Sequence, residues 1–150
     1  MQKTIKNKIQ ISGKGLHTGI YTKITLIPAK ENSGIRFRRI DLKKKPYIKA
    51  LIKNIDKTQR RTVIKENGAI VETVEHILAA ITASSIDNLI IELDGPEIPI
   101  LDGSSKVFME KIEESGIINQ NKPKTQFEIL NYFKVENKID NSKIEFFPQN

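Results

Sequence analysis

Hydrophobic and polar residues alternate with a period of two in several segments of the first seventy residues. In segment 22–29, Ile24 and Leu26 alternate with Lys23 and Thr25. Successive side chains of a strand point to opposite faces, so this pattern predicts a half-buried strand. Other segments that alternate, or that are continuously apolar over a short run, are also predicted to be strands: 34–41, 47–55, 61–65, 69–73 and 88–93.

A helical period then replaces the period of two. Val74, Ile77, Leu78 and Ile81 stand at i, i+3, i+4 and i+7, which places four apolar side chains on one stripe of a helix. Thr73 precedes this stripe and is a plausible N-cap, because its hydroxyl could accept a hydrogen bond from a backbone N–H of the first turn. The pattern predicts a helix that begins near residue 74.

A second helix is predicted over 106–116. Val107, Phe108 and Ile112 would face inward, and Gly116 is suited to the C-cap because glycine tolerates the backbone angles that end a helix. Before this helix, the prolines of 94–105 favour a turn followed by extended chain.

Turn and linker signals complete the organisation. Asn67 and Gly68 suit a type I′ hairpin turn, because both tolerate positive φ. The polar segment 119–124 is typical of a linker, and 126–150 is predicted to form two strands around a turn. A lone two-stranded hairpin is marginal in water, so we expect one complete αβ domain over 1–122 and the opening of a second over 123–150.

The net charge of +7 raises the possibility of a basic nucleic-acid-binding domain. Only five of the 25 basic residues are arginine, and no aromatic residues are interleaved with the scattered lysines. We therefore expect no nucleic-acid partner and keep DNA or RNA binding as a distant alternative. The chain has no cysteine, no signal-peptide pattern and no apolar run of membrane-spanning length, so we expect a cytoplasmic protein without stable membrane insertion.

Glu75 and His76 are the first candidate for chemistry. A neutral imidazole is a good zinc ligand, and an adjacent carboxylate can take the proton of a zinc-bound water. The alternative is structural: a glutamate in the first turn complements the helix dipole, and the histidine is simply solvated. A catalytic zinc site needs three protein ligands, which this pair alone does not supply.

Three further segments hold candidate residues, and each has a structural alternative. His17 lies in a glycine-rich stretch, SGKGLHTG, which would otherwise be an exposed hairpin turn. Arg60 and Arg61 in TQRRT could contact an anion or be solvated charge. Asp102, in DGPEIPILDGSS, could be only a turn or cap residue.

Taken together and in this order, the motifs resemble one family. GLHTG is followed by an arginine–arginine–x–aspartate strand end, T-x-R-x-T, TVEH, IDN and GPEIPILDGSS. This combination is similar to the UDP-3-O-acyl-N-acetylglucosamine deacetylases, the zinc amidases of lipid A synthesis. The resemblance implies an α+β fold: a two-layer domain of a mixed sheet packed on two helices, followed here by the first hairpin of a truncated second domain of the same type.

The resemblance also implies roles for individual residues. His76 matches a zinc ligand, and Glu75 matches the general base that deprotonates the zinc-bound water attacking the N-acetyl amide. Four positions match residues that edge the substrate site: Leu16, His17, Thr58 and Arg60. The expected substrate is a UDP-linked acylated glucosamine, and the expected cofactor is Zn²⁺.

The remaining zinc ligands of the family come from a helix of its second domain. After His76 this chain has no histidine. We therefore expect a deacetylase fragment that is inactive alone. Two alternatives are one half of a split enzyme, with a second polypeptide supplying the other domain, and a non-catalytic module that binds the substrate.

Overall fold

The largest sheet in the computed structural model has five strands. The structure describes residues 1–56, 59–125 and 127–148. The sheet contains β2 (Ile9–Lys14), β3 (Tyr21–Pro28), β9 (Leu89–Leu93), β4 (Ile35–Arg39) and β5 (Tyr47–Lys49), in that spatial order. β4 runs parallel to β9 and the other neighbours are antiparallel, so the sheet is mixed. The α+β class predicted from the sequence is confirmed.

A second sheet of three antiparallel strands stands beside the first. It contains β6 (Ile55–Asp56), β7 (Val63–Glu66) and β8 (Ala69–Glu72). Asn67 and Gly68 join the last two strands with φ angles of 53° and 74°, so the predicted turn with positive φ at both positions is confirmed.

The single strand predicted over 47–55 is wrong. The chain leaves the five-stranded sheet after β5, makes a short 3-10 turn (Ile52–Asn54) and enters the three-stranded sheet as β6. The apolar residues of this segment are therefore divided between two sheets. Ile52, in the turn between them, is 87% exposed. This division explains why the alternation in the segment is irregular.

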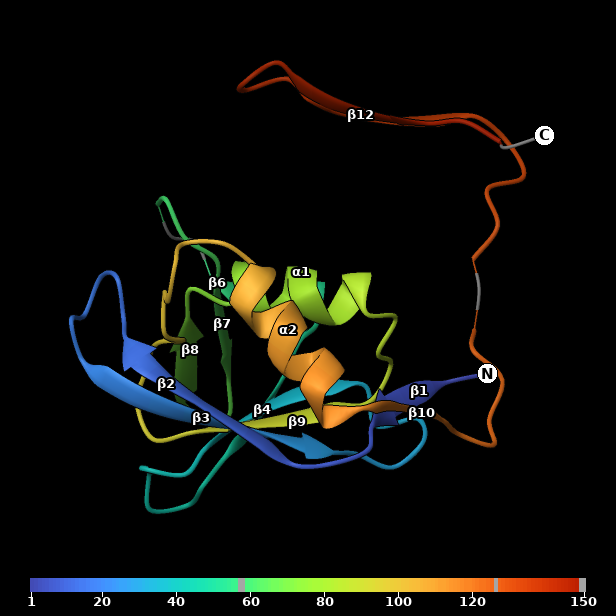
Figure 1. Cartoon of the computed structure of the whole chain (residues 1–150). Coiled ribbons are helices and arrows are strands. Elements are labelled where there is room, and N and C mark those ends of the chain that lie inside the picture. The colour runs from blue at the N-terminus through green and yellow to red at the C-terminus, as the bar shows by residue number, and fades with distance from the viewer. Residues whose placement is uncertain (57–58, 126, 149–150) are drawn as a thin grey trace.

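Two helices cover one face of the large sheet (Figure 1). α1 (Glu75–Ala83) and α2 (Lys106–Ser115) pack against each other, and both contribute to the core that lies against the sheet. Phe108 and Ile112 of α2 are fully buried, and Gly116 ends that helix with a φ of 72°. Both predicted helices are confirmed, and none of the described helices is long and apolar enough to span a membrane.

The predicted N-cap of α1 is wrong by one residue. Val74 occupies the N-cap, and no side chain caps this helix. Thr73 has a φ of 57°, and its hydroxyl donates a hydrogen bond to another segment instead of accepting one from the helix. The buried stripe itself is as predicted, since Val74, Ile77 and Ile81 are at most 2% exposed.

A third sheet, which has two strands, is not predicted by the sequence pattern. β1 (Lys3–Ile5) pairs antiparallel with β10 (Ile117–Asn119). Beside it, the buried Asn88 amide donates to the side-chain oxygens of Gln2 and Gln120. The start of the predicted linker is thus fixed to the N-terminal segment and to the residue that precedes β9.

The C-terminal hairpin stands apart from these sheets (Figure 1). β11 (Phe133–Asn137) and β12 (Ser142–Phe146) form the predicted pair of antiparallel strands. Most of their side chains are exposed, including those of Phe133 and Ile144.

Candidate functional site

The glycine-rich connection between β2 and β3 is held by one buried carboxylate. Glu97 is fully buried and accepts hydrogen bonds from the backbone N–H of His17 at 3.0 Å and of Thr18 at 2.8 Å. The hydroxyl of Thr18 donates to the same carboxylate at 2.7 Å. The loop that carries His17 is therefore fixed through its backbone, and the imidazole itself plays no part in this contact.

Glu97 also reaches the chain that leads into α1. The hydroxyl of Thr73 donates to Oε1 of Glu97 at 2.7 Å. The segment of Glu97 runs parallel to the end of β8, where the N–H of Ile98 donates to the carbonyl of Glu72 at 3.1 Å. The carboxylate thereby joins the His17 loop to the residue that stands two positions before Glu75.

Gly15 shows how closely the loop approaches this carboxylate. A methyl group built on Gly15 would overlap Oε2 of Glu97 and would also crowd the hydroxyl of Thr18. Only glycine leaves room for the carboxylate at this point, so a larger residue would displace it.

The environment of Glu97 sets its protonation state. Burial alone would raise the pKa of this carboxyl, but the hydrogen bonds from Thr18, Thr73 and His17 outweigh that effect and lower the pKa from its ordinary 4.5 to about 2. Glu97 is therefore a carboxylate at neutral pH, and it can accept hydrogen bonds at both oxygens.

Glu75 opens α1 and is held by the segment that follows the TQRRT motif. Its Oε2 accepts a hydrogen bond from the backbone N–H of Thr62 at 3.1 Å. The neighbouring Arg61 pairs with Glu72 at 2.9 Å, which secures the same segment to the end of β8. Within the described part of the chain, no hydrogen bond to Oε1 of Glu75 accompanies this contact.

His76 follows Glu75 and is half-buried. It makes no hydrogen bond with any residue that the structure describes, which leaves its ring nitrogens for a ligand. Among residues 1–56, 59–125 and 127–148, however, no group of three or more histidine, aspartate or glutamate side chains could hold a metal ion. These residues therefore do not present a complete zinc site by themselves.

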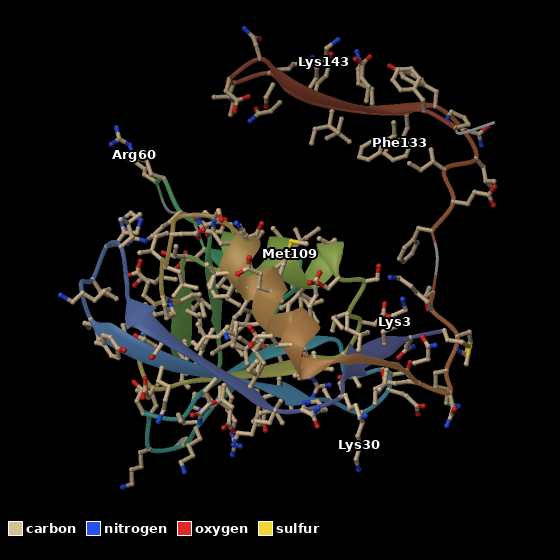
Figure 2. The ribbon with its side chains drawn as sticks, viewed as in Figure 1. Lys3, Lys30, Arg60, Met109, Phe133 and Lys143 are labelled. Carbon is tan, nitrogen blue, oxygen red and sulfur yellow. The ribbon has the colours of Figure 1, made fainter. Side chains whose placement is uncertain are left out.

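The structure brings some of the predicted site residues together and separates others. Leu16 is 61% exposed on the loop that Glu97 holds, next to His17. Arg60 is exposed, with a φ of 61°, and Figure 2 shows its side chain at the tip of a loop that projects from the domain. Thr58 lies outside the described residues.

Two other acidic residues of the sequence motifs have structural contacts. Asp102 accepts hydrogen bonds from the backbone N–H and the hydroxyl of Ser104, as expected for a residue of the turn before α2. Asp41 accepts from Arg39 at 2.9 and 2.7 Å, and this guanidinium holds the pKa of Asp41 below its usual value. Both carboxylates thus stabilise local chain geometry.

Two residues of this site are not predicted by the sequence pattern. The segment around Glu97 indicates only extended chain with prolines, and the position of Thr73 suggests a helix cap. The sequence does hold one indication that Glu97 is unusual: in PEIPI it is the one charged residue of an otherwise apolar segment. A charged side chain in such a place is buried only when several donors meet it.

Comparison with known proteins matches the whole chain to one family. The family model described as UDP-3-O-acyl N-acetylglycosamine deacetylase matches residues 2–150. A UDP-3-O-acyl-N-acetylglucosamine deacetylase from Thermosynechococcus vestitus is 44% identical over 123 residues, which are 82% of this chain and 43% of that protein. The enzyme of the same name from Brucella melitensis biotype 2 is 40% identical over 147 residues, 98% of this chain and 51% of its own length.

Another relative is named for two activities. The bifunctional enzyme LpxC/FabZ of Porphyromonas gingivalis is 41% identical over 147 residues, which cover 98% of this chain and 32% of that protein. The chain thus spans between about a third and a half of the length of these relatives.

Proposed function

Because this chain belongs to the UDP-3-O-acyl N-acetylglycosamine deacetylase family, we propose that it supplies one side of the active site of a zinc-dependent deacetylase. The substrate would be a UDP-linked, 3-O-acylated N-acetylglucosamine, and the reaction would release acetate from its amide. The observation that carries this proposal is the start of α1, where the Thr62 N–H holds one oxygen of Glu75 and His76 stands beside it.

In this proposal Glu75 is the general base. The hydrogen bond from Thr62 fixes Oε2, so the carboxylate presents Oε1 in one orientation. A carboxylate held this way can accept the proton of an attacking water and pass it to the departing amine. Because one of its oxygens remains bound to the backbone throughout, the base does not have to be reoriented between the two proton transfers.

His76 would be one zinc ligand, and the chemistry of a bound zinc ion would be to polarise the amide carbonyl and acidify a water. The remaining ligands would come from a second domain of the same type, which has a layer of helices facing α1 and α2. We propose that residues 1–122 form the first two-layer domain and that 123–150 begin the second. A split arrangement, with the second domain on another polypeptide, would complete the site equally well.

Leu16, His17, Thr58 and Arg60 are proposed to edge the groove that takes the acylated sugar nucleotide. The exposure of Leu16 and Arg60 supports this role, because residues that contact a substrate must be reachable from solvent. We place the reaction in the cytoplasm, where nucleotide-linked sugars are made.

A chimeric enzyme tests the proposed function. The matching region of the Thermosynechococcus vestitus deacetylase would be replaced by residues 1–122 of this chain, and acetate release from the UDP-linked substrate would be measured. We expect the chimera to be active, and Glu75→Ala to lower kcat by roughly 10²–10⁴-fold, the range typical of a lost general base. Glu110→Gln, at an exposed position of α2, is the matched control and should retain activity. A folded chimera in which Glu75→Ala keeps full activity would refute the assignment.

A further inference from the structure

Four hydrogen-bond donors from two separate segments meet at the carboxylate of Glu97. The backbone N–H groups of His17 and Thr18 and the hydroxyl of Thr18 come from the β2–β3 connection. The hydroxyl of Thr73 comes from the junction between β8 and α1. A single buried side chain thus links the loop that carries Leu16 to the start of α1.

We propose that Glu97 is a positioning residue, which fixes the loop of Leu16 and His17 relative to the start of α1, where Glu75 and His76 stand. This inference rests on the proposed function, because the position of the loop matters to catalysis only if Glu75 and His76 have the roles proposed for them. Glu97 itself is fully buried, so it acts through its hydrogen-bonded neighbours and does not contact substrate.

Loop residues 15–20 have little else to hold them in place. Their other hydrogen bonds among the described residues run within the loop itself: Gly15 donates to Ile20, Gly19 donates to Gly15, and the N–H of Ile20 donates to the hydroxyl of Thr18. Leu16 is 61% exposed and therefore contributes little burial that could anchor the loop. Without Glu97, the loop would keep its turn but lose its fixed position on the domain.

The arrangement requires a carboxylate rather than an amide. Oε1 accepts from the Thr73 hydroxyl, Oε2 accepts from the N–H and the hydroxyl of Thr18, and the His17 N–H is shared at 3.0 Å and 3.2 Å between the two oxygens. Glutamine has one acceptor oxygen and one NH₂ group. In either orientation the NH₂ group would face a backbone N–H that cannot accept a hydrogen bond, that of His17 at the Oε1 position or that of Thr18 at the Oε2 position, so Glu97→Gln preserves size but weakens the hold on the loop.

The hydrogen-exchange rates of the loop amides measure how firmly Glu97 holds the loop. We expect Glu97→Gln to speed exchange of the His17 and Thr18 amides by about tenfold or more, the factor that corresponds to losing a charge-assisted hydrogen bond. Asp94→Asn is the matched control, because Asp94 stands three residues before Glu97 and accepts the N–H of Lys23 at 2.7 Å, outside the loop. It should leave both amides unchanged.

A distance measured between the loop and α1 then tests whether the loop is held in one position, which amide exchange does not report. The chain has no cysteine, so spin labels can be placed uniquely at Leu16→Cys and Ala79→Cys, both exposed positions. Thr73→Val removes the link to α1 while the loop keeps its bonds to Glu97. We expect a narrow distance distribution in the parent chain, a broader one in Thr73→Val, and a narrow one again in Thr73→Ser, which restores the hydroxyl.

These measurements decide the inference even if one variant does not fold. If Glu97→Gln is folded but amide exchange and label distances stay as in the parent, the inference is wrong. If Glu97→Gln does not fold, the two Thr73 variants test the inference instead. A distance distribution in Thr73→Val that is unchanged from the parent would overturn the positioning role. Neither readout requires activity, so an inactive chimera would refute the proposed function without affecting this result.

Discussion

At the scale of single residues, the buried carboxylate of Glu97 makes the stability of the domain depend on pH. Its pKa is about 2 in the folded protein, below the ordinary value of 4.5 that it regains when the hydrogen bonds from the loop are lost. A group whose pKa is lowered on folding stabilises the folded state above its unfolded pKa, and this contribution is lost as the pH falls toward the folded value. The relevant window therefore lies between about pH 4.5 and pH 2.

We predict that Glu97→Gln is less stable than the parent at pH 7 and that the difference shrinks across this window. A pKa shift of this size corresponds to about 3 kcal/mol. Urea unfolding of both proteins at several pH values measures the difference. Stability curves that stay parallel from neutral pH to the lower end of the window would show that the ionisation of Glu97 is not coupled to folding.

The residues of the candidate site differ in how far the sequence reveals them. Glu75 and His76 stand out as candidates because the pair opens a regular apolar stripe, and their proposed roles come from the resemblance of the combined motifs to one family. Glu97 cannot be identified in this way, because its role depends on donors that lie 24 and 80 positions away in the chain. Contacts of this separation leave no periodic signal, and only the folded structure brings them together.

At the scale of elements, α2 attaches to the domain through two fully buried side chains, those of Phe108 and Ile112. Phe108 is fully buried and belongs to the main core, whereas Glu110 on the same helix is exposed. We predict that Phe108→Ala lowers the free energy of unfolding by about 3–5 kcal/mol, because it removes buried surface and leaves a cavity. Glu110→Ala should change it by less than about 0.5 kcal/mol. Denaturant unfolding monitored by circular dichroism measures both, and similar losses in the two variants would contradict this packing.

The helices are the most predictable elements because each has a continuous stripe of apolar residues. The short strands are the least predictable. β1 and β10 have three residues each, and what defines them is their pairing across more than a hundred positions of the chain. The segment 47–55 shows a related limit: its apolar residues are shared between two sheets, so no single alternation describes it.

At the scale of the whole molecule, residues 1–122 should fold without the rest of the chain. Among the residues that the structure describes, two polar contacts join them to the next segment: the carbonyl of Pro123 accepts a hydrogen bond from Gln2, and Lys124 pairs with Asp87 at 3.0 Å. Lys124 is about half exposed, and exposed ion pairs contribute only about 0–1 kcal/mol. We predict that removing 123–150 changes the free energy of unfolding by less than about 2 kcal/mol, the sum of one such ion pair and one hydrogen bond. A larger loss in denaturant unfolding would place the domain boundary further along the chain.

The hairpin has two unlike faces. Cross-strand pairing sets Phe133 beside Phe146 and Val135 beside Ile144, while the charged side chains alternate with them on the other face. In Figure 2, Phe133 points toward the helix side of the domain and Lys143 points away from it. A two-stranded hairpin with an uncovered apolar face is marginal in water, and the proposed second domain would cover this face.

The last prediction concerns the metal. His76 offers one ligand, and a catalytic zinc site needs three. We therefore expect the purified chain to retain almost no zinc after dialysis against a weak chelator, and the chimera with the relative's second domain to retain about one zinc per chain, the content of a catalytic site. In that chimera His76→Ala should abolish the retained zinc, whereas Glu75→Ala should leave it in place, because a base is not a ligand. Elemental analysis measures all four proteins. Zinc retained by the chimera carrying His76→Ala would mean that the ligand from this chain has been misassigned, while stoichiometric zinc on the isolated chain would mean that its own residues complete the site.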